Sequence, residues 1–367
     1  MSGRGPFSGT PTWPDVHPAT VITVVLLIAY PSFASAFFTF QIGAYSLILG
    51  TIALSLMMLA GYGGMVSLAQ LTVAGLAGYL VAILGDNSVN VMGLGWPWWL
   101  TVPVAILAAA TLSALIGAIS VRTEGIYTIM ITLAIAVAFF YFVRQNYVLF
   151  NGFSGFAGVE PPTLLGIYWR DPVPFYYLSL VVAGFFLMAV FYGARSTFGL
   201  ALQAIRDNPR RMRALGFNVT LHRVVAYFLS GLIAGTAGIL MVWFNGRISP
   251  GSVGVDIVID ILVIAVVGGL RHPIGPFLGA TAFVLLDNFA IDLIDRERFN
   301  TVIGLAFLGV VLFSPDGLLG LWNRIRPRLR FDRNARPMAG RAEPDVGGPD
   351  TNVRETATRE IWDASTE

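Results

Sequence analysis

The sequence contains no cysteine and no lysine among its 367 residues, and all 23 of its basic residues are arginine. Without cysteine, the chain can form no disulfide and no thiolate metal site. Without lysine, it cannot contain a phosphate-binding loop of the G-x-x-x-x-G-K-[ST] type, because that loop needs its lysine. If ATP drives a process in which this chain takes part, another chain must bind the nucleotide.

Charge is scarce as well. Only 12% of the residues are charged and 56% are hydrophobic, whereas a soluble domain has about 25% charged residues. The mean hydropathy is +0.72. The 40 glycines and 20 prolines are residues that membrane helices tolerate better than soluble helices do. This composition predicts an all-α polytopic membrane protein.

The residues of enzymatic chemistry are also few. The three histidines, His17, His222 and His272, lie in loops or at helix edges, with no carboxylate or serine at a spacing typical of a catalytic triad. The sequence has no H-E-x-x-H or similar metal motif. We expect no enzyme active site and no catalytic residue, and likewise no cofactor, no metal ion and no nucleic acid partner.

About ten apolar stretches could cross a bilayer, which takes about 20 residues. They cover residues 21–40, 44–61, 65–84, 98–120, 125–143, 174–193, 223–243, 255–270, 274–291 and 300–320. The segment Pro31–Ala36 resembles a signal-peptide cleavage site, but the apolar sequence continues past it, which favours an uncleaved helix. We expect a disordered arm over 1–19, a transmembrane domain over 20–322 and a disordered cytoplasmic tail over 323–367.

The arginines predict the orientation. If the N-terminus is cytoplasmic and the chain crosses ten times, thirteen arginines up to residue 330 lie inside and five lie outside. Cytoplasmic loops of membrane proteins carry such an excess of basic residues. We therefore expect both termini in the cytoplasm.

The loop 198–219, between the sixth and seventh spans, is strongly basic and should be ordered. Asp207 or Asn208 can cap a short helix that has Pro209 at its first position and Gly216 just past its end. Four apolar side chains in the loop need burial, but no core is expected on this side of the chain: Leu202, Ile205, Met212 and Leu215. The pattern favours docking on a partner protein, and the alternative is a basic stripe on anionic lipid headgroups.

Polar residues occur within several spans. The glycines of 61–64 should interrupt a helix, and Ser67, Gln70 and Thr72 follow them. Such residues at membrane depth need protein or a water-filled cavity around them. They could line a translocation path, but the segment could equally serve helix packing through Gly75-x-x-Gly78.

Two further polar patterns are candidates for the same path. Thr128 and Thr132 are one helical turn apart and share a face with Glu124; they could instead bond to carbonyls of the preceding turn. Asp260 follows Asp256 by four residues within a span, where a carboxylate is a functional candidate or a structural acceptor. The pairs Gly231-x-x-x-Gly235 and Gly275-x-x-x-Gly279 are typical of close helix packing.

Several of these segments, in this order, resemble the permeases of branched-chain amino acid ABC transporters of the LivM type, with the urea permeases as close relatives. The matching stretches are Gly61–Gln70, Thr123–Leu133, Ala204–Asn208 with Ala214–Gly216, and Val266–Leu270 followed by Ile274–Ala280. The chain departs from the family pattern at Met65–Gln70, where Gly-Gln-Ser-Leu-Gly-Gln is frequent, and at Leu71–Ala74, where an aromatic-rich turn is common.

The resemblance implies a multi-pass permease subunit of an importer in the bacterial inner membrane, surrounded by membrane lipid, for branched-chain amino acids or a similar small polar solute such as urea or an amide. It implies three kinds of protein partner: a second permease subunit, ATP-binding subunits and an extracytoplasmic solute-binding protein. The residues expected to couple to the ATPase are Ala204, Ile205, Arg206, Asp207, Asn208, Arg210, Arg211, Leu215 and Gly216. Those expected on the translocation path are Ser67, Gln70, Thr72, Tyr127, Thr128, Thr132 and Asp260.

Two other kinds of transporter share this general pattern. A sugar permease of a related ABC family would keep the topology and carry a polyol. A secondary transporter driven by an ion gradient would carry paired carboxylates mid-membrane in two repeated halves, and the sequence contains no convincing repeat of that kind. A structural scaffold without transport activity is a third alternative.

Overall fold

The computed structural model describes residues 18–88, 93–123, 125–163, 166, 168–293 and 304. The expected tail 323–367, the tenth span 300–320 apart from one residue, Glu124 and nearly all of the N-terminal arm lie outside this described part. The ten-span topology and the position of the termini therefore stay predictions.

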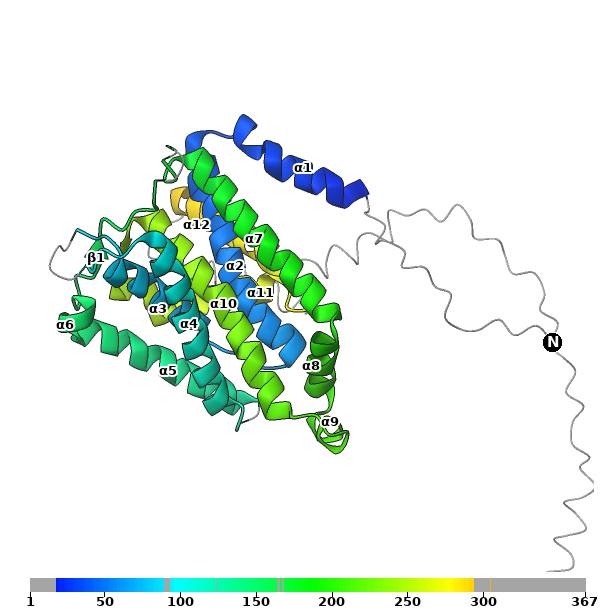
Figure 1. Cartoon of the computed structure of the whole chain (residues 1–367). Coiled ribbons are helices and arrows are strands. Elements are labelled where there is room, and N and C mark those ends of the chain that lie inside the picture. Colours follow the sequence, from blue (N-terminus) through cyan, green and yellow to red (C-terminus); the bar gives the residue numbers. More distant parts are fainter. Residues whose placement is uncertain are drawn as a thin grey trace, which may run out of the picture. The chain divides into compact units, whose positions relative to one another are not determined.

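The described part of the chain is mainly helical (Figure 1). Its first half contains α1 (Pro18–Phe33), η1 (Phe38–Ala44), α2 (Tyr45–Met57), η2 (Met58–Tyr62), α3 (Gln70–Leu84), α4 (Trp98–Ser120), α5 (Ile126–Gln145), α6 (Tyr147–Phe150) and the strand β1 (Phe156–Ala157). Its second half contains α7 (Pro172–Arg195), α8 (Thr197–Asp207), α9 (Pro209–Ala214), α10 (Val219–Asn245), the strand β2 (Arg247–Ile248), η3 (Pro250–Val253), α11 (Val255–Gly268) and α12 (Gly275–Leu293).

Five helices of the described part are long and apolar enough to cross a membrane: Phe38–Tyr62, Trp98–Ser120, Ile126–Gln145, Pro172–Arg195 and Val219–Asn245. Four of them fall on expected spans with boundaries shifted by a few residues. Two other expected spans contain shorter helices, α3 with 15 residues and α11 with 14. A bilayer crossing takes about 20 residues, so these two helices need non-helical flanks shielded by protein.

The first span differs from the expectation. Residues 21–40 do not form one helix, because α1 ends at Phe33 and the next helix begins at Phe38 and continues through α2 to Tyr62. Pro31 lies inside α1 and lacks the N–H that would bond to the Leu27 carbonyl. The Tyr176 hydroxyl of α7 donates to that carbonyl at 2.9 Å instead. The proline thus creates a free acceptor through which α1 is held to α7.

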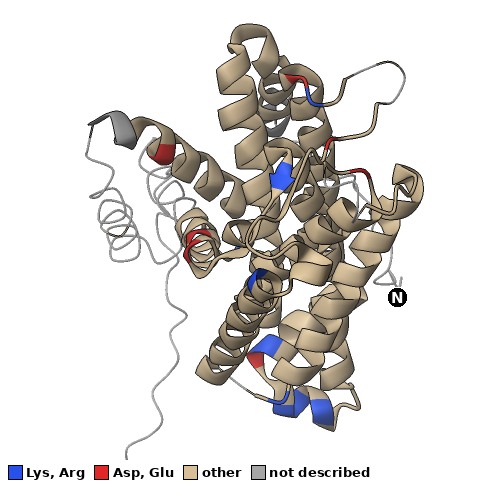
Figure 2. Ribbon diagram, turned by 90° about the vertical axis from the view of Figure 1, so that its left-hand side faces the viewer, with Lys and Arg blue, Asp and Glu red and all other residues tan. Residues whose placement is uncertain are grey.

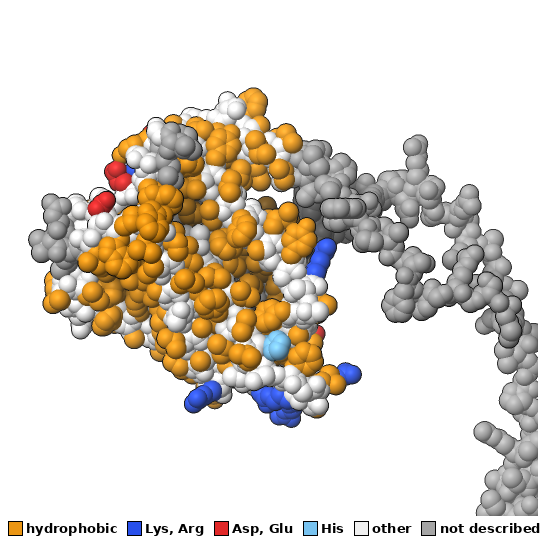
Figure 3. Space-filling view, viewed as in Figure 1, with side chains coloured by type: hydrophobic (Ala, Val, Ile, Leu, Met, Phe, Trp, Pro, Cys, Tyr) orange, Lys and Arg blue, Asp and Glu red, His pale blue; other side chains and the backbone are white. Residues whose placement is uncertain are grey.

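The helix formed by η1, α2 and η2 lies at the centre of the bundle. It is the most buried of the five long helices, 83% buried, and α7, α10, α11 and α12 pack against it. The long helices α4, α5 and α7 are only 22–33% buried and therefore lie at the periphery. Hydrophobic side chains cover most of the face seen in Figure 3. An exposed apolar surface of this kind suits contact with lipid.

Small residues set the distances between helices. A side chain at Gly238 of α10 would overlap the backbone of Ala74 in α3, so the two helices cross at van der Waals contact. Similar close contacts join α10 to α4 at Gly231 and Gly235, and α12 to α11 at Gly275 and Gly279. The close packing predicted for both glycine pairs is confirmed. The Gly75-x-x-Gly78 pair also packs, against Val253 and Val242 respectively.

The two ends of the bundle differ in their charged residues (Figure 2). Most arginines of the described part gather at the end formed by α8, α9 and the first turn of α10, which we call the basic end. At the opposite end, β1 pairs antiparallel with β2, with Phe156 opposite Ile248. This short ribbon joins the loop before α7 to the loop before α11.

Candidate functional site

The loop at the basic end folds as two short helices. Asn208 caps α9, because its Oδ1 accepts from the Arg211 N–H at 3.0 Å, and Pro209 is the first helical residue. The helix stops before Gly216, whose φ of +87° favours glycine. Of the two expected caps, Asn208 holds α9, whereas Asp207 is the last residue of α8. The local geometry predicted for the loop is confirmed.

The apolar side chains of this loop correct one expectation. Leu202, Ile205 and Met212 are only 2%, 0% and 7% exposed within this single chain, whereas Leu215 is 65% exposed. The chain does provide a core here, because α8 folds back against α7, α10 and η2. That packing depends on how the helices are arranged and cannot be seen in the local sequence. Of the four expected side chains only Leu215 remains to bury against a partner, and Leu200 and Phe217 of the same loop are also exposed.

Arg206 bonds α8 to the end of the central helix. Its Nη1 donates to the Gly61 carbonyl oxygen at 2.5 Å, and its Nε donates to Asp207 Oδ1 at 3.0 Å. Its aliphatic part covers Gly64, where a Cβ would lie 2.6 Å from Arg206 Cγ. Gly64 has a φ of +66°, so glycine is favoured on both grounds. The basic loop and the glycine-rich interruption are therefore one contact region.

The interruption, residues 63–69, and Gly61 just before it contact the turn between α11 and α12 and the helix α5. A side chain at Gly61 would overlap the Leu270 carbonyl oxygen in the turn between α11 and α12. The Leu68 N–H donates to Thr132 Oγ1 of α5 at 3.1 Å. Non-helical backbone at membrane depth must find its hydrogen bonds within protein. Here a threonine of α5 supplies one of them.

Gln70 stands where α3 begins and joins three helices. Its Oε1 accepts from Ser55 Oγ of α2 at 3.2 Å and from Ser230 Oγ of α10 at 3.0 Å. Its Nε2 has no hydrogen-bond partner among the described residues. Ser67 is fully buried beside the Tyr227 hydroxyl. Such interhelical hydrogen bonds contribute about 0.6 kcal/mol each in membrane proteins, so the cluster specifies register more than it stabilises.

The expected path residues separate into a buried and an exposed group. Five of them are at most 5% exposed: Ser67, Gln70, Thr72, Thr128 and Thr132. Both threonines of α5 bond to preceding carbonyls, Thr128 to Thr123 and Thr132 to Thr128, as the alternative interpretation predicted. Asp260 is half-buried on α11, within electrostatic range of Asp256 and Asp287. Tyr127 stands apart, because it is 68% exposed on α5.

The exposed face of α5 was not recognised from the sequence. Its members recur every three or four residues, so they form one stripe, which we call the α5 face. It consists of Tyr127, Met130, Ala134, Ala138 and Tyr141. Thr128, Thr132 and Ala136 occupy the buried side of the same helix. Alanines on a lipid-facing helix are unremarkable, and only the contrast with the buried threonines could have indicated the face.

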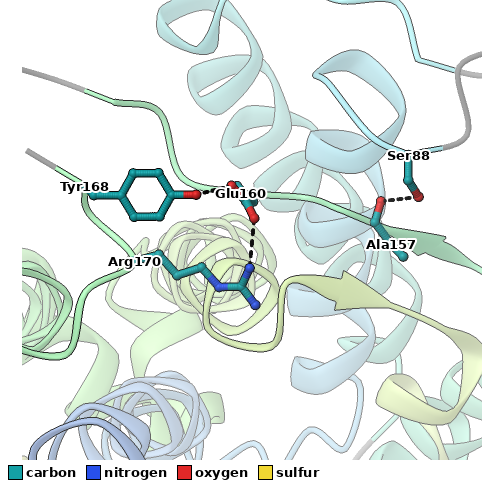
Figure 4. Close-up of polar contacts among 5 residues, drawn as sticks. All are labelled: Ser88, Ala157, Glu160, Tyr168 and Arg170. Atoms are coloured by element: carbon teal, nitrogen blue, oxygen red, sulfur yellow. Dashed lines mark hydrogen bonds and ion pairs between the residues drawn. The ribbon is translucent and has the colours of Figure 1, made fainter. Parts of the chain in front are cut away.

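The opposite end of the bundle carries a polar cluster around Glu160 (Figure 4). Glu160 also borders a cavity of about 500 Å³. Glu160 accepts from the Tyr168 hydroxyl at 2.7 Å and from Arg170 Nη1 at 2.9 Å. Nearby, Ser88 Oγ donates to the Ala157 carbonyl of β1 at 2.8 Å. The hydrogen bond from Tyr168, and then the charge of Arg170, hold the pKa of Glu160 below its ordinary value of 4.5.

This cluster gives a pH-dependent prediction. Because the pKa of Glu160 is lower in the folded chain, its stabilisation is present above about pH 4.5 and is lost as the pH falls through the folded value. The group is exposed, so the effect is at most about 1 kcal/mol. We expect Glu160→Gln to lower thermal stability slightly at about pH 7, with a difference that shrinks as the pH is lowered toward 3. Asp86→Asn at the same end is the control, and a pH-independent difference would contradict the assignment.

Comparison with known proteins identifies the family to which the chain belongs. Residues 38–314 match the family described as "Branched-chain amino acid transport system / permease component". The high-affinity branched-chain amino acid transport system permease protein LivM of Escherichia coli (strain K12) is 25% identical over 86% of this chain and 77% of its own length. A probable branched-chain amino acid transport permease protein LivH of Methanocaldococcus jannaschii is 28% identical over 78% of this chain and 84% of its own length.

Relatives with other solutes in their names also match. The ribose import permease protein RbsC of Haemophilus influenzae is 24% identical over 66% of this chain and 76% of its own length. No solved structure matches the chain. The similarity therefore extends across permeases whose names give different solutes.

Proposed function

The chain belongs to the family of branched-chain amino acid transport permeases, and from this premise we propose that it is the membrane-spanning subunit of an ATP-driven importer in the bacterial inner membrane. The family resemblance and the apolar helices make it a multi-pass membrane protein. Since it has no lysine for a phosphate-binding loop, separate ATP-binding subunits would supply the energy.

One observation carries the proposal: a series of contacts leads from the basic loop to the buried side of α5, the helix that carries the α5 face. Arg206 of α8 bonds to Gly61, the segment after Gly61 bonds through Leu68 to Thr132, and Thr132 lies on the buried side of α5. A movement of α8 would therefore displace the interruption and, with it, α5. Energetic coupling needs such contiguous contacts between elements that can take two arrangements.

The basic end is proposed to face the cytoplasm, in accord with the positive-inside rule. There the exposed Leu215, with Arg210 and Arg211 beside it, would contact the ATP-binding subunits. The opposite end, with the Glu160 cluster and its cavity, would meet the extracytoplasmic solute-binding protein.

The translocation path is proposed to run along the α5 face, between this chain and a second permease subunit. A side chain that lines such a path must be exposed in the single chain, and Tyr127 meets that condition. The buried polar residues would not line the path but would hold the helices that line it in position: Ser67, Gln70, Thr72, Thr128 and Thr132. Small residues such as Ala134 let backbones approach closely, and Asp260 stays a candidate on α11.

The solute is proposed to be a branched-chain amino acid or a similar small polar molecule, such as urea or an amide, by similarity to the LivM and LivH relatives. A sugar is the second candidate, because the ribose permease relative also matches over two thirds of this chain. Competition between leucine and ribose for binding to the cognate solute-binding protein would separate the two.

Reconstitution tests the proposed class. We expect proteoliposomes that contain this chain alone to take up no solute, with or without an ion gradient. Uptake should appear only when the second permease, the ATP-binding subunits, the solute-binding protein and internal ATP are all present. Transport by the chain alone along an ion gradient would establish a secondary transporter and overturn the proposal.

A further inference from the structure

An apolar groove opens between α7 and α10 near the basic end. It has a volume of about 270 Å³ and is bounded by the end of the central helix and by the first turn of α8. We call it the α7–α10 groove. Its lining comprises Met58, Tyr62, Phe185, Phe186, Ala189, Val190, Gly193, Ala194, Phe198, Gly199, Leu202, Leu229, Leu232 and Ile233.

The groove continues into the surface that faces lipid. Phe185, at its edge, is 65% exposed, and Val181, Met188 and Tyr192 of the same helix are exposed between 57% and 69%. The α7 helix is one of the five long apolar helices and only 28% of it is buried. An apolar groove that opens onto the hydrocarbon region will contain the hydrocarbon of the surrounding lipid unless protein covers it.

Its polar rim carries a positive charge. Arg195 ends α7 directly after the groove residues Gly193 and Ala194, and its side chain is exposed. Its charge acts on Tyr62, which lines the groove. No hydrogen bond or ion pair of Arg195 occurs within the described part of the chain. A guanidinium at the end of a membrane helix attracts the phosphate of an anionic lipid.

We infer that the α7–α10 groove binds one anionic phospholipid of the cytoplasmic leaflet, with an acyl chain in the groove and its phosphate at Arg195. The inference goes beyond the proposed transport function. The site borders Tyr62 and α8, so the lipid would fill the space beside the contact between Arg206 and Gly61. A protein helix is the competing occupant, but it would leave the Arg195 charge without a phosphate partner.

Gly193 offers a way to fill the groove. A Cβ at position 193 would meet no heavy atom within 4 Å, and Gly193 lines the groove, so we expect the side chain of Gly193→Leu to enter it. Gly184 has equally open space but lies nine residues earlier, on the other side of α7. Gly184→Leu is therefore a matched control. Arg195→Gln removes the charge, and Arg122→Gln at the same end is its control.

The test counts lipids on the full-length chain purified in mild detergent, by native mass spectrometry during titration with phosphatidylglycerol or phosphatidylcholine of equal chain length. We expect Arg195→Gln to weaken phosphatidylglycerol binding about fivefold and to weaken phosphatidylcholine binding less, because choline offsets the charge of the phosphate that both lipids carry. Gly193→Leu should abolish the tightly retained lipid, and both control variants should keep it. Equal retention by Gly193→Leu and Gly184→Leu would overturn the site.

Two further outcomes decide the remaining alternatives. If Arg195→Gln weakens both lipids equally, or neither, the assignment of the phosphate to Arg195 is wrong. If a photoreactive residue at position 185 labels another protein chain in the assembled transporter instead of phospholipid, the occupant is a partner subunit. Because Arg195 is exposed, its substitution should not unfold the chain, so the test stands even if Gly193→Leu folds poorly.

Discussion

Replacing Arg206 with alanine is expected to reduce ATP-dependent solute uptake about tenfold or more, while ATP hydrolysis and membrane insertion persist. The substitution removes the charged donor that holds α8 to the Gly61 carbonyl. A hydrogen bond to a charged group contributes about 1.5–3 kcal/mol, and 1.4 kcal/mol corresponds to a factor of ten. Uptake and ATP hydrolysis measured in the same proteoliposomes would give the coupling ratio directly.

The control for this variant is Arg213→Ala in the adjacent helix α9. Arg213 is exposed and carries the same charge, but no contact joins it to the interruption among the described residues. If both variants lose uptake equally, the loss reflects the net charge of the loop and not the bond to Gly61. Undiminished uptake by Arg206→Ala would remove Arg206 from the coupling pathway.

Replacing Ala134 with tryptophan is expected to abolish uptake or the association with the second permease, without loss of folding. Ala134 is exposed at the middle of the α5 face, so the indole meets no core of this chain. It would block the close approach that small residues permit, or occlude the path beside it. Uptake and co-purification of the second permease would be measured together, because they distinguish occlusion from failed assembly.

Val181→Trp on α7 provides the comparison for this variant. Val181 is 69% exposed on a peripheral helix of similar burial to α5. Under the present assignment its replacement faces lipid, so uptake should be preserved. If Val181→Trp abolishes uptake and Ala134→Trp does not, the subunit interface belongs to α7 instead of α5.

The two variants test the ends of one series of contacts. Arg206 lies in the basic loop. Ala134 lies on the exposed side of α5, opposite Thr132, whose hydroxyl accepts from the Leu68 N–H of the interruption. The coupling residues were expected from the family resemblance, but their connection to α5 was not. Close contacts explain the glycines at 61 and 64. A side chain at Gly61 would displace Leu270, and one at Gly64 would displace Arg206.

Most helices could be predicted from the sequence because lipid imposes a simple rule. A segment of about 20 apolar residues becomes helical wherever the backbone finds no water, so α4, α5, α7 and α10 begin and end close to the expected residues. The cap of α9 at Asn208 and the end of α9 before Gly216 could also be predicted, because both depend on residues that are neighbours in the sequence. The break at residues 34–35 was not predicted, because the apolar sequence continues past it.

The amino-acid sequence by itself determined that this chain is helical, lies in a membrane, has no nucleotide-binding lysine and carries an ordered basic loop. Each of these depends on composition or on neighbours within a few residues. Tertiary structure alone decided that Leu202, Ile205 and Met212 are buried within the chain, that Gln70 joins three helices, and that Tyr127 faces outward while Thr128 faces inward. The physical reason is that these contacts join different helices and depend on which helix covers which face. A sequence pattern describes the faces of one helix only.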